Sequence, residues 1–170
     1  MRSYSIALMV RNEYGVLNRV TSMFRRRQVN ITGLTVSETE TEELSRITVQ
    51  FMGEDRAEHQ LVAQLAKLPD VISFKEFDPD DSISCELLLI KVANHEETRS
   101  QVLDAAAAFH AKVVDYTRDS IVFRLAGQSR RVDNFIDLMR DFEILEVCRT
   151  GIISLERGKT VMRRNVATVQ

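Results

Sequence analysis

The sequence predicts an α+β protein made of two tandem units, each with the element order βαββαβ. Two observations support this prediction. Short apolar runs typical of strands are interspersed with amphipathic helical stretches, and the order seen in the first half recurs roughly 70 to 80 positions later. A short acidic stretch with a proline, Asp78–Ser82, separates the halves. We therefore expect a first domain at residues 1–78, a linker at 79–83 and a second domain at 84–158.

The elements of the first half follow from apolar periodicity and from turn residues. Apolar and polar residues alternate in 45–51, as in an antiparallel strand with one exposed face, and the polar residues 39–43 predict a hairpin loop. Leu61, Leu65 and Leu68 form one stripe of a helix that Pro69 ends. The predicted strands are 4–10, 29–37, 45–51 and 71–77, and the predicted helices are 15–27 and 55–68.

The second half repeats this order with a shorter hairpin turn at Thr117–Asp119. Ser129 is a suitable N-cap for the second of its helices. The predicted strands are 85–92, 112–116, 120–125 and 144–155, the last one interrupted near Gly151, and the predicted helices are 96–109 and a stretch that follows Ser129. Each half therefore has the order of a ferredoxin-like domain. Residues 159–170 lack an apolar period and are expected to form a frayed tail.

Composition argues against several classes of function. The chain has 170 residues, 44% of them hydrophobic and 28% charged, which is ordinary for a globular protein in solution. The net charge of −2 gives no electrostatic case for nucleic acid, and no apolar run approaches the length of a membrane span. No signal-peptide pattern is present, so we expect a cytoplasmic protein. Cys85 and Cys148 lie in predicted strands and are expected to be buried, reduced thiols.

No group of residues has the pattern of a catalytic or metal site. His59, His95 and His110 have no paired spacing that would hold a metal ion, and we expect them at the surface. No nucleophile is accompanied by a base, so no catalytic residue is predicted. The same topology occurs in RNA-recognition domains and in small enzymes of the acylphosphatase type. However, the predicted central strands lack paired aromatic residues for base stacking, and no loop has the pattern of a phosphate cradle.

The most informative stretch joins the first strand to the first helix. Gly15 stands at the helix entry, where the amides of Gly15, Val16 and Leu17 are expected to be unpaired at the positive end of the helix dipole. Such amides can hold a small anion such as the carboxylate of an amino acid. Asn12 offers both a donor and an acceptor nearby. A plain structural role, with Gly15 permitting a tight turn and Asn12 capping the helix, explains the same residues.

Motifs along nearly the whole chain resemble those of one protein family. In the first half they are Asn12–Leu17, Phe24, Arg26-Arg27, Asn30-Ile31, Leu34–Val36 and Leu44–Thr48. In the second half they are Glu86-Leu87, Leu89–Val92, Ala111–Asp115, Asp133–Ile136, Glu146–Ile152, Leu155, Arg157 and Gly158. This ordered set is similar to the regulatory (small) subunit family of acetolactate synthase, also called acetohydroxyacid synthase.

The resemblance implies an N-terminal ACT domain that forms a homodimer edge to edge and binds a branched-chain amino acid, usually valine, between subunits. It also implies a separate catalytic subunit that carries thiamine diphosphate, Mg²⁺ and FAD, none of which should bind this chain. The small subunit would activate that partner and confer feedback inhibition in the biosynthesis of valine, leucine and isoleucine. An alternative is a free-standing ACT-domain sensor that acts on another enzyme or regulator.

The resemblance also implies where the effector binds. One subunit would supply the ligand loop, and the other would bring the segment around Asn30 to the ligand. Amides of the loop would take the carboxylate, an asparagine would bind the ammonium group, and apolar side chains would enclose the isopropyl group. The implied effector-binding residues are Asn12, Gly15, Val16, Leu17, Asn30, Ile31 and Leu34.

Two positions depart from the pattern of the family. Position 14 is usually small or proline, and Tyr14 could narrow or cover the pocket. Position 28 is usually glycine at the helix end. If Gln28 must adopt a left-handed conformation there, the cost is roughly 1 kcal/mol.

Overall fold

The computed structural model describes residues 2–53, 55–78 and 81–162. The described residues fall into two compact units, one drawn from residues 1–83 and 153–170 and the other from residues 84–152. The second unit is thus connected to the first at both of its ends. Of the expected linker 79–83, residues 79 and 80 lie outside the described part, and Ser82 and Ile83 begin a strand.

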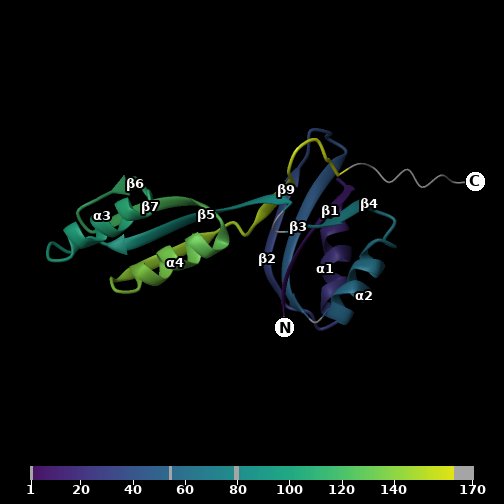
Figure 1. Cartoon of the computed structure of the whole chain (residues 1–170), viewed down its shortest axis with the longest axis horizontal. Coiled ribbons are helices and arrows are strands. Elements are labelled where there is room, and N and C mark those ends of the chain that lie inside the picture. Colours follow the sequence, from purple (N-terminus) through teal and green to yellow (C-terminus); the bar gives the residue numbers. More distant parts are fainter. Residues whose placement is uncertain (1, 54, 79–80, 163–170) are drawn as a thin grey trace, which may run out of the picture. The chain divides into compact units, whose positions relative to one another are not determined.

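The first unit has one sheet and two helices. Its four strands are antiparallel in the order β2-β3-β1-β4, which is the ferredoxin-like arrangement that the sequence predicts. Both helices lie on one face of this sheet (Figure 1). The elements are β1 (Arg2–Arg11), α1 (Val16–Arg26), β2 (Ile31–Glu38), β3 (Leu44–Gly53), α2 (Asp55–Leu65), β4 (Val71–Glu76) and β9 (Ile153–Glu156), the last paired with β5 (Ser82–Ala93).

The core of the first unit lies between the sheet and the helices. Phe24 of α1 packs edge-on against Phe51 of β3, with 5.4 Å between the ring centroids. Alternate residues of β1 and β3 face the same core, as the period of a strand requires. The core residues are Tyr4, Ile6, Leu8, Val10, Val16, Val20, Phe24, Ile47, Val49, Phe51, Leu61, Val62 and Leu65.

The opposite face of this sheet, which we call the outer face, is buried near its centre. Ala7, Met9 and Thr48 are at most 8% exposed. The chain that follows the second unit covers them, because Arg46 donates a hydrogen bond to the Ser154 carbonyl and Lys75 forms a 2.8 Å ion pair with Glu156. Ser154 and Glu156, which the sequence analysis assigned to the second domain, therefore contact the first sheet, and residues 153–158 belong to the first unit. Residues 163–170 of the expected tail lie outside the described residues.

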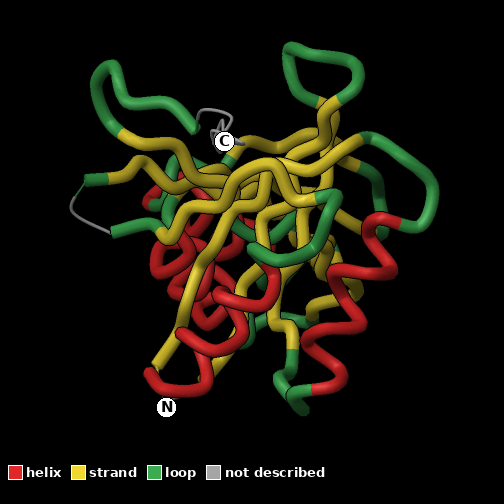
Figure 2. The backbone as a smooth tube through the Cα atoms, turned by 90° about the vertical axis from the view of Figure 1, so that its right-hand side faces the viewer, coloured by secondary structure: helices red, strands yellow, loops and turns green. Residues whose placement is uncertain are grey.

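The second unit repeats the topology of the first with the strand order β6-β7-β5-β8. Helices α3 and α4 pack against Leu88, Ile90 and Val92 of β5. Figure 2 shows the strands of both units in yellow and their helices in red. The remaining elements are α3 (Arg99–Ala108), β6 (Lys112–Tyr116), β7 (Ser120–Gly127), α4 (Ser129–Met139) and β8 (Ile144–Arg149).

The other face of the second sheet is open in the single chain. Leu89 is 40% exposed and is paired in register with Cys148, which is exposed as well. Cys85 is half-buried, and both cysteines are free. The expectation of buried thiols is therefore wrong for Cys148, because the strand that carries it has no covering layer on this face.

A charged cluster fixes the end of the second unit. Glu86 is 3% exposed and accepts two hydrogen bonds from Arg149, at 2.6 and 2.9 Å, and one from Ser129 at 2.7 Å. The hydrogen bonds from Arg149 lower the pKa of the Glu86 carboxyl, and the same contacts raise the pKa of Arg149. Arg149 also pairs with Asp133 of α4 at 2.8 Å, so the cluster ties together β5, α4 and β8.

Two helices end in the same left-handed turn. Gln28 has a φ of 55°, and the Val29 amide donates to the Phe24 carbonyl across the end of α1. His110 has a φ of 50°, and the Ala111 amide donates in the same way at the end of α3. This is the Schellman arrangement, in which glycine is usual. Because of the turn at Gln28, the second strand begins at Ile31, two residues later than the sequence predicts. The predicted interruption of the last strand near Gly151 is confirmed, because this stretch forms two strands, β8 and β9.

Among the described residues, no helix combines the length and the apolar character needed to cross a membrane.

Candidate functional site

The corner between β1 and α1, residues 12–17, has the geometry that the sequence predicts for Gly15. Gly15 is the N-cap of α1 and has a φ of 80°, a left-handed conformation that favours glycine. Its carbonyl accepts from the Arg19 amide at 3.0 Å, and no side chain caps the helix. Gly15 and Leu17 are exposed, whereas Val16 packs into the core. The helix therefore presents its N-terminal end to solvent without a side-chain partner.

One of the three amides expected to be unpaired has a partner. The Val16 amide donates to the Glu13 carbonyl at 3.4 Å, so the expectation is wrong for this residue. The turn that brings Gly15 into its left-handed conformation also brings these two groups together. Because 3.4 Å is long for such a bond, the interaction is weak. The helix entry therefore offers a small anion mainly the amides of Gly15 and Leu17.

Asn12 is held by the hairpin between β2 and β3. Its Nδ2 donates to the Glu42 carbonyl at 3.0 Å and approaches a Glu38 carboxylate oxygen at 3.4 Å, and its own amide donates to Glu43. Asn12 does not cap the helix, which argues against the plain capping role. With both Nδ2 hydrogens directed at acceptors, Oδ1 remains to accept a hydrogen bond from a ligand.

The second unit contains a structural twin of this arrangement. Asn94 follows β5 as Asn12 follows β1, and its Nδ2 donates to the Thr117 carbonyl in the corresponding hairpin at 2.7 Å. Its amide likewise donates to Asp119. Here the Oδ1 atom accepts a 2.8 Å hydrogen bond from the guanidinium of Arg99. An oxygen in this position therefore suits a cationic donor, which in the first unit would have to come from a ligand.

Arg19 adds a positive charge beside the helix entry. Its Nε donates to Asp70 at 2.6 Å, and Asp70 is only 8% exposed. A Cβ atom at Gly15 would lie 3.4 Å from Nη1 of Arg19, so the guanidinium stands directly over the turn. The sequence analysis missed this pair because the two residues are 51 positions apart. The only local signal was an arginine in the first helical turns.

The remaining implied site residues are Asn30, which precedes the edge strand β2, and Ile31 and Leu34 on that strand. Asn30 and Ile31 lie far from this corner within one chain. Glu38 at the end of β2 is beside Asn12, whereas Ile31 begins the strand. Seven residues at about 3.4 Å each separate the two ends by roughly 24 Å. The structure therefore does not bring Asn30 and Ile31 to the loop in one chain. Two antiparallel copies of β2 would do so, because the start of one would lie beside the end of the other.

The β2 edge has an apolar border that suits such pairing. Leu34 and Val36 are 36% and 44% exposed, and Leu17 of α1 is 40% exposed. Leu34 and Val36 are in register with Val49 and Ile47 of the core, so they lie on the helix side of the sheet, but α1 leaves them uncovered. Tyr14 is fully exposed at 103% and covers nothing in the single chain.

The part of the chain that the structure describes contains no group of three or more metal-binding side chains. All three histidines are exposed, as predicted, and His95 pairs with Glu143 at 2.7 Å.

Comparisons with known proteins agree with the two-unit architecture. The family model for an "AHAS small subunit-like ACT domain" matches residues 6–73, and the model for the "Small subunit of acetolactate synthase" matches residues 85–158. A probable acetolactate synthase small subunit from Archaeoglobus fulgidus is 41% identical over 155 residues, covering 91% of this chain and 97% of that protein. The chain belongs to the acetolactate synthase small-subunit family.

Other members of the family are similar over nearly their whole length. The acetolactate synthase small subunit of Bacillus subtilis is 41% identical over 155 residues, covering 90% of each chain. The crystal structure of the small subunit from Thermotoga maritima has a TM-score of 0.85 with 30% identity, and the match covers 94% of this chain and 100% of that one. The candidate residues from Asn12 to Leu34 all lie within the region that the ACT-domain model matches.

Proposed function

We propose that this chain is a non-catalytic regulatory subunit that binds the acetolactate synthase catalytic subunit, raises its activity and makes it sensitive to valine. Family membership supports the existence of a catalytic partner. Thiamine diphosphate, Mg²⁺ and FAD would belong to that partner, and the complex would be cytoplasmic.

The observation that carries the proposal is the separation of the two halves of the implied effector site along β2. The loop at Asn12–Leu17 and the segment at Asn30-Ile31 lie at opposite ends of one strand, and that strand is an exposed edge with apolar neighbours. We therefore propose a homodimer in which two β2 edges lie antiparallel. Each loop would then face Asn30, Ile31 and Leu34 of the second chain.

The charges of the corner give the ligand an orientation. The carboxylate of valine would bind near the Gly15 and Leu17 amides and the Arg19 guanidinium. Its ammonium group would donate to Oδ1 of Asn12, in the way that Arg99 donates to Asn94 in the second unit. The Glu38 carboxylate beside Asn12 would favour the same positive charge. The isopropyl group would point toward the apolar residues of the second chain.

Reconstitution with the cognate catalytic subunit tests the proposal. The chain alone should form no acetolactate, its addition should raise the rate of the catalytic subunit, and valine should reduce that rate. Asn12→Ala should weaken inhibition by valine, and the matched variant Asn94→Ala should not, although each loses the same hydrogen bond to a hairpin carbonyl. Acetolactate made by the purified chain alone would overturn the regulatory role. Co-purification with a different enzyme would favour a free-standing sensor.

A further inference from the structure

The outer face of the first sheet contains a cavity that the proposed effector site does not use. The cavity has a volume of about 410 Å³ and lies between β4 and the segment that follows β9. That volume is within the range of about 300–1,000 Å³ that is typical of small-molecule sites. All of the lining residues belong to the first unit, and they are Ser73, Phe74, Lys75, Glu156, Lys159, Thr160, Val161 and Met162.

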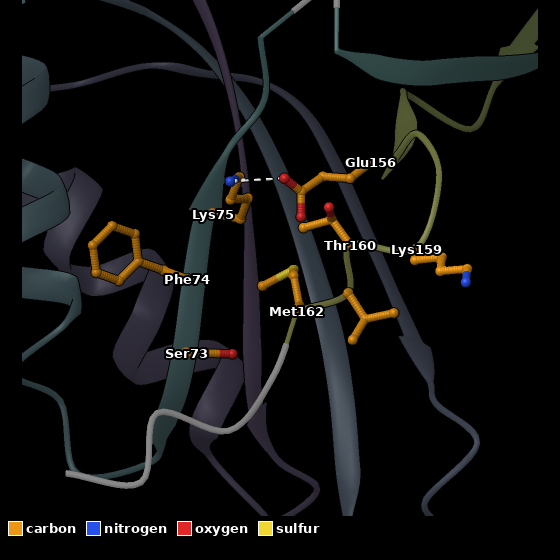
Figure 3. A pocket seen from close by; sticks show the side chains of 8 residues that line it. Ser73, Phe74, Lys75, Glu156, Lys159, Thr160 and Met162 are labelled. Carbon is orange, nitrogen blue, oxygen red and sulfur yellow. Dashed lines mark ion pairs between the residues drawn. The ribbon is translucent and has the colours of Figure 1, made fainter.

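The wall of this cavity contains a buried hydroxyl that has no hydrogen-bond partner among the described residues. Ser73 is 5% exposed, and its Oγ makes no hydrogen bond to any residue in the described ranges. Figure 3 shows this hydroxyl directed from β4 toward the segment that carries Met162. A buried polar group normally has a partner, and leaving it unpaired costs about 1–3 kcal/mol. The orphan hydroxyl therefore points to a hydrogen-bonding occupant of the cavity.

The same cavity presents one charge of each sign. Lys75 and Glu156 form a 2.8 Å ion pair in its wall, with side chains 42% and 15% exposed. In Figure 3 this pair lies beside the hydroxyl of Thr160, whereas the side chains of Lys159 and Phe74 point away from it. The two charges of this ion pair balance, and Met162 and Val161 add an apolar wall.

From these groups we infer that the cavity binds a zwitterionic amino acid with an apolar side chain, at a second site distinct from the β2 edge. Lys75 would take the carboxylate and Glu156 the ammonium group, each by a charge-assisted hydrogen bond. Ser73 would donate its hydroxyl to the carboxylate, and Met162 would contact the side chain. A simple anion fits less well, because Glu156 would repel it.

Calorimetric titration of the full-length Gly15→Asp variant with L-leucine tests this inference, because that substitution weakens the proposed edge site and leaves the cavity unchanged. Leucine should still bind. Adding Lys75→Gln or Ser73→Ala should weaken the residual binding by about tenfold to a hundredfold, the effect of losing one hydrogen bond to a charged group. 4-Methylpentanoate, which lacks the ammonium group, and 3-methylbutylamine, which lacks the carboxylate, should bind weakly or not at all.

The chain offers a matched control for each substitution. Lys67→Gln removes the same charge as Lys75→Gln, but from an exposed side chain that does not line the cavity. Ser5→Ala removes the other buried hydroxyl without a partner among the described residues, and Ser5 does not line the cavity. Each control should change leucine affinity by less than about threefold. Circular dichroism establishes that all variants are folded.

The possible outcomes separate this inference from the proposed function. If the Gly15→Asp variant does not bind leucine, or if Lys75→Gln and Lys67→Gln have equal effects, there is no second site. If 4-methylpentanoate binds with the same affinity as leucine, the cavity is a site for simple anions and not for zwitterions. If the wild type and Gly15→Asp bind leucine identically and Ser73→Ala abolishes the binding, the edge site is wrong and the cavity is the effector site.

Discussion

Replacement of Gly15 by aspartate, compared with replacement by asparagine, separates the effect of charge from that of backbone strain at the proposed effector corner. Gly15 has a φ of 80°, so any L side chain there is strained by about 1–2 kcal/mol. A Cβ atom would stand 3.4 Å from Nη1 of Arg19. An aspartate carboxylate would therefore bind this guanidinium and occupy the place proposed for the carboxylate of valine.

The size of the charge effect follows from the geometry. Two like charges about 4 Å apart repel by about 1 kcal/mol in water and about 4 kcal/mol near a protein surface. Because Gly15 is exposed, we expect a value of about 1–2 kcal/mol, or roughly a fivefold to thirtyfold loss of valine affinity. Gly15→Asn is the matched control, since it has the same shape and strain without the charge. The loss of valine affinity should be larger for Gly15→Asp than for Gly15→Asn by that factor.

The assay is a valine inhibition curve for each variant reconstituted with the catalytic subunit, supported by calorimetry on the chain alone. Activation of the catalytic subunit should survive in both variants, because neither substitution reaches the core. Unchanged inhibition in both variants would place the effector elsewhere and leave residues 12–17 as an ordinary helix entry. Equal loss in both would show that the corner binds no carboxylate and that only its backbone shape matters.

Three further predictions concern stability. Gln28→Gly should stabilise the first unit by about 1 kcal/mol in denaturant titrations, because Gln28 holds a φ of 55° at the end of α1; a decrease would contradict that reasoning. The pKa of Glu86 is lowered from an ordinary value of 4.5, so its stabilising contribution is complete above that pH and is lost as the pH falls toward the lower, folded value. Glu86→Gln should therefore destabilise the protein by about 1.5–3 kcal/mol at pH 7 and remove this acid dependence, whereas an unchanged pH profile would refute it. A fragment of residues 1–80 should fold and dimerise, because it contains both helices and all four strands of the first sheet, but with lower stability than the same unit in the full chain, since Ala7, Met9 and Thr48 lose their cover. An unfolded fragment by circular dichroism would mean that the first unit requires residues 153–162.

The sequence predicted most of the fold because the signals were local. Alternating residues in 45–51 and the leucine stripe of 55–68 follow from the geometry of a single strand or helix, and the tandem order followed from repeating them. The position of β9 could not be predicted from the sequence, because it depends on contacts with Arg46 and Lys75, which are more than 80 residues away along the chain. No periodicity within residues 144–158 encodes that contact.

The candidate site was predicted unevenly for the same reason. The left-handed conformation of Gly15 could be inferred from one residue and its neighbours, and the structure confirms it. The contact between Val16 and Glu13 depends on the detailed path of the turn, which the residue types do not specify. Arg19 and Asp70 meet only when the chain is folded. The separation of Asn30 from Asn12 is a property of strand order, which residue spacing alone does not reveal.

The central claim is that the effector site is completed by two chains, and valine binding to a mixed dimer tests it most directly. Gly15→Asp chains and Asn30→Ala chains carrying different tags are co-expressed, and the mixed dimer is isolated by both tags. A site made by two chains predicts that the mixed dimer has one intact site, formed by the loop of the Asn30→Ala chain and the segment of the Gly15→Asp chain. Calorimetry should then show half of the wild-type number of β2-edge sites at wild-type affinity, while both homodimers bind valine weakly at that edge. A mixed dimer without any site of wild-type affinity would mean that each site lies within a single chain.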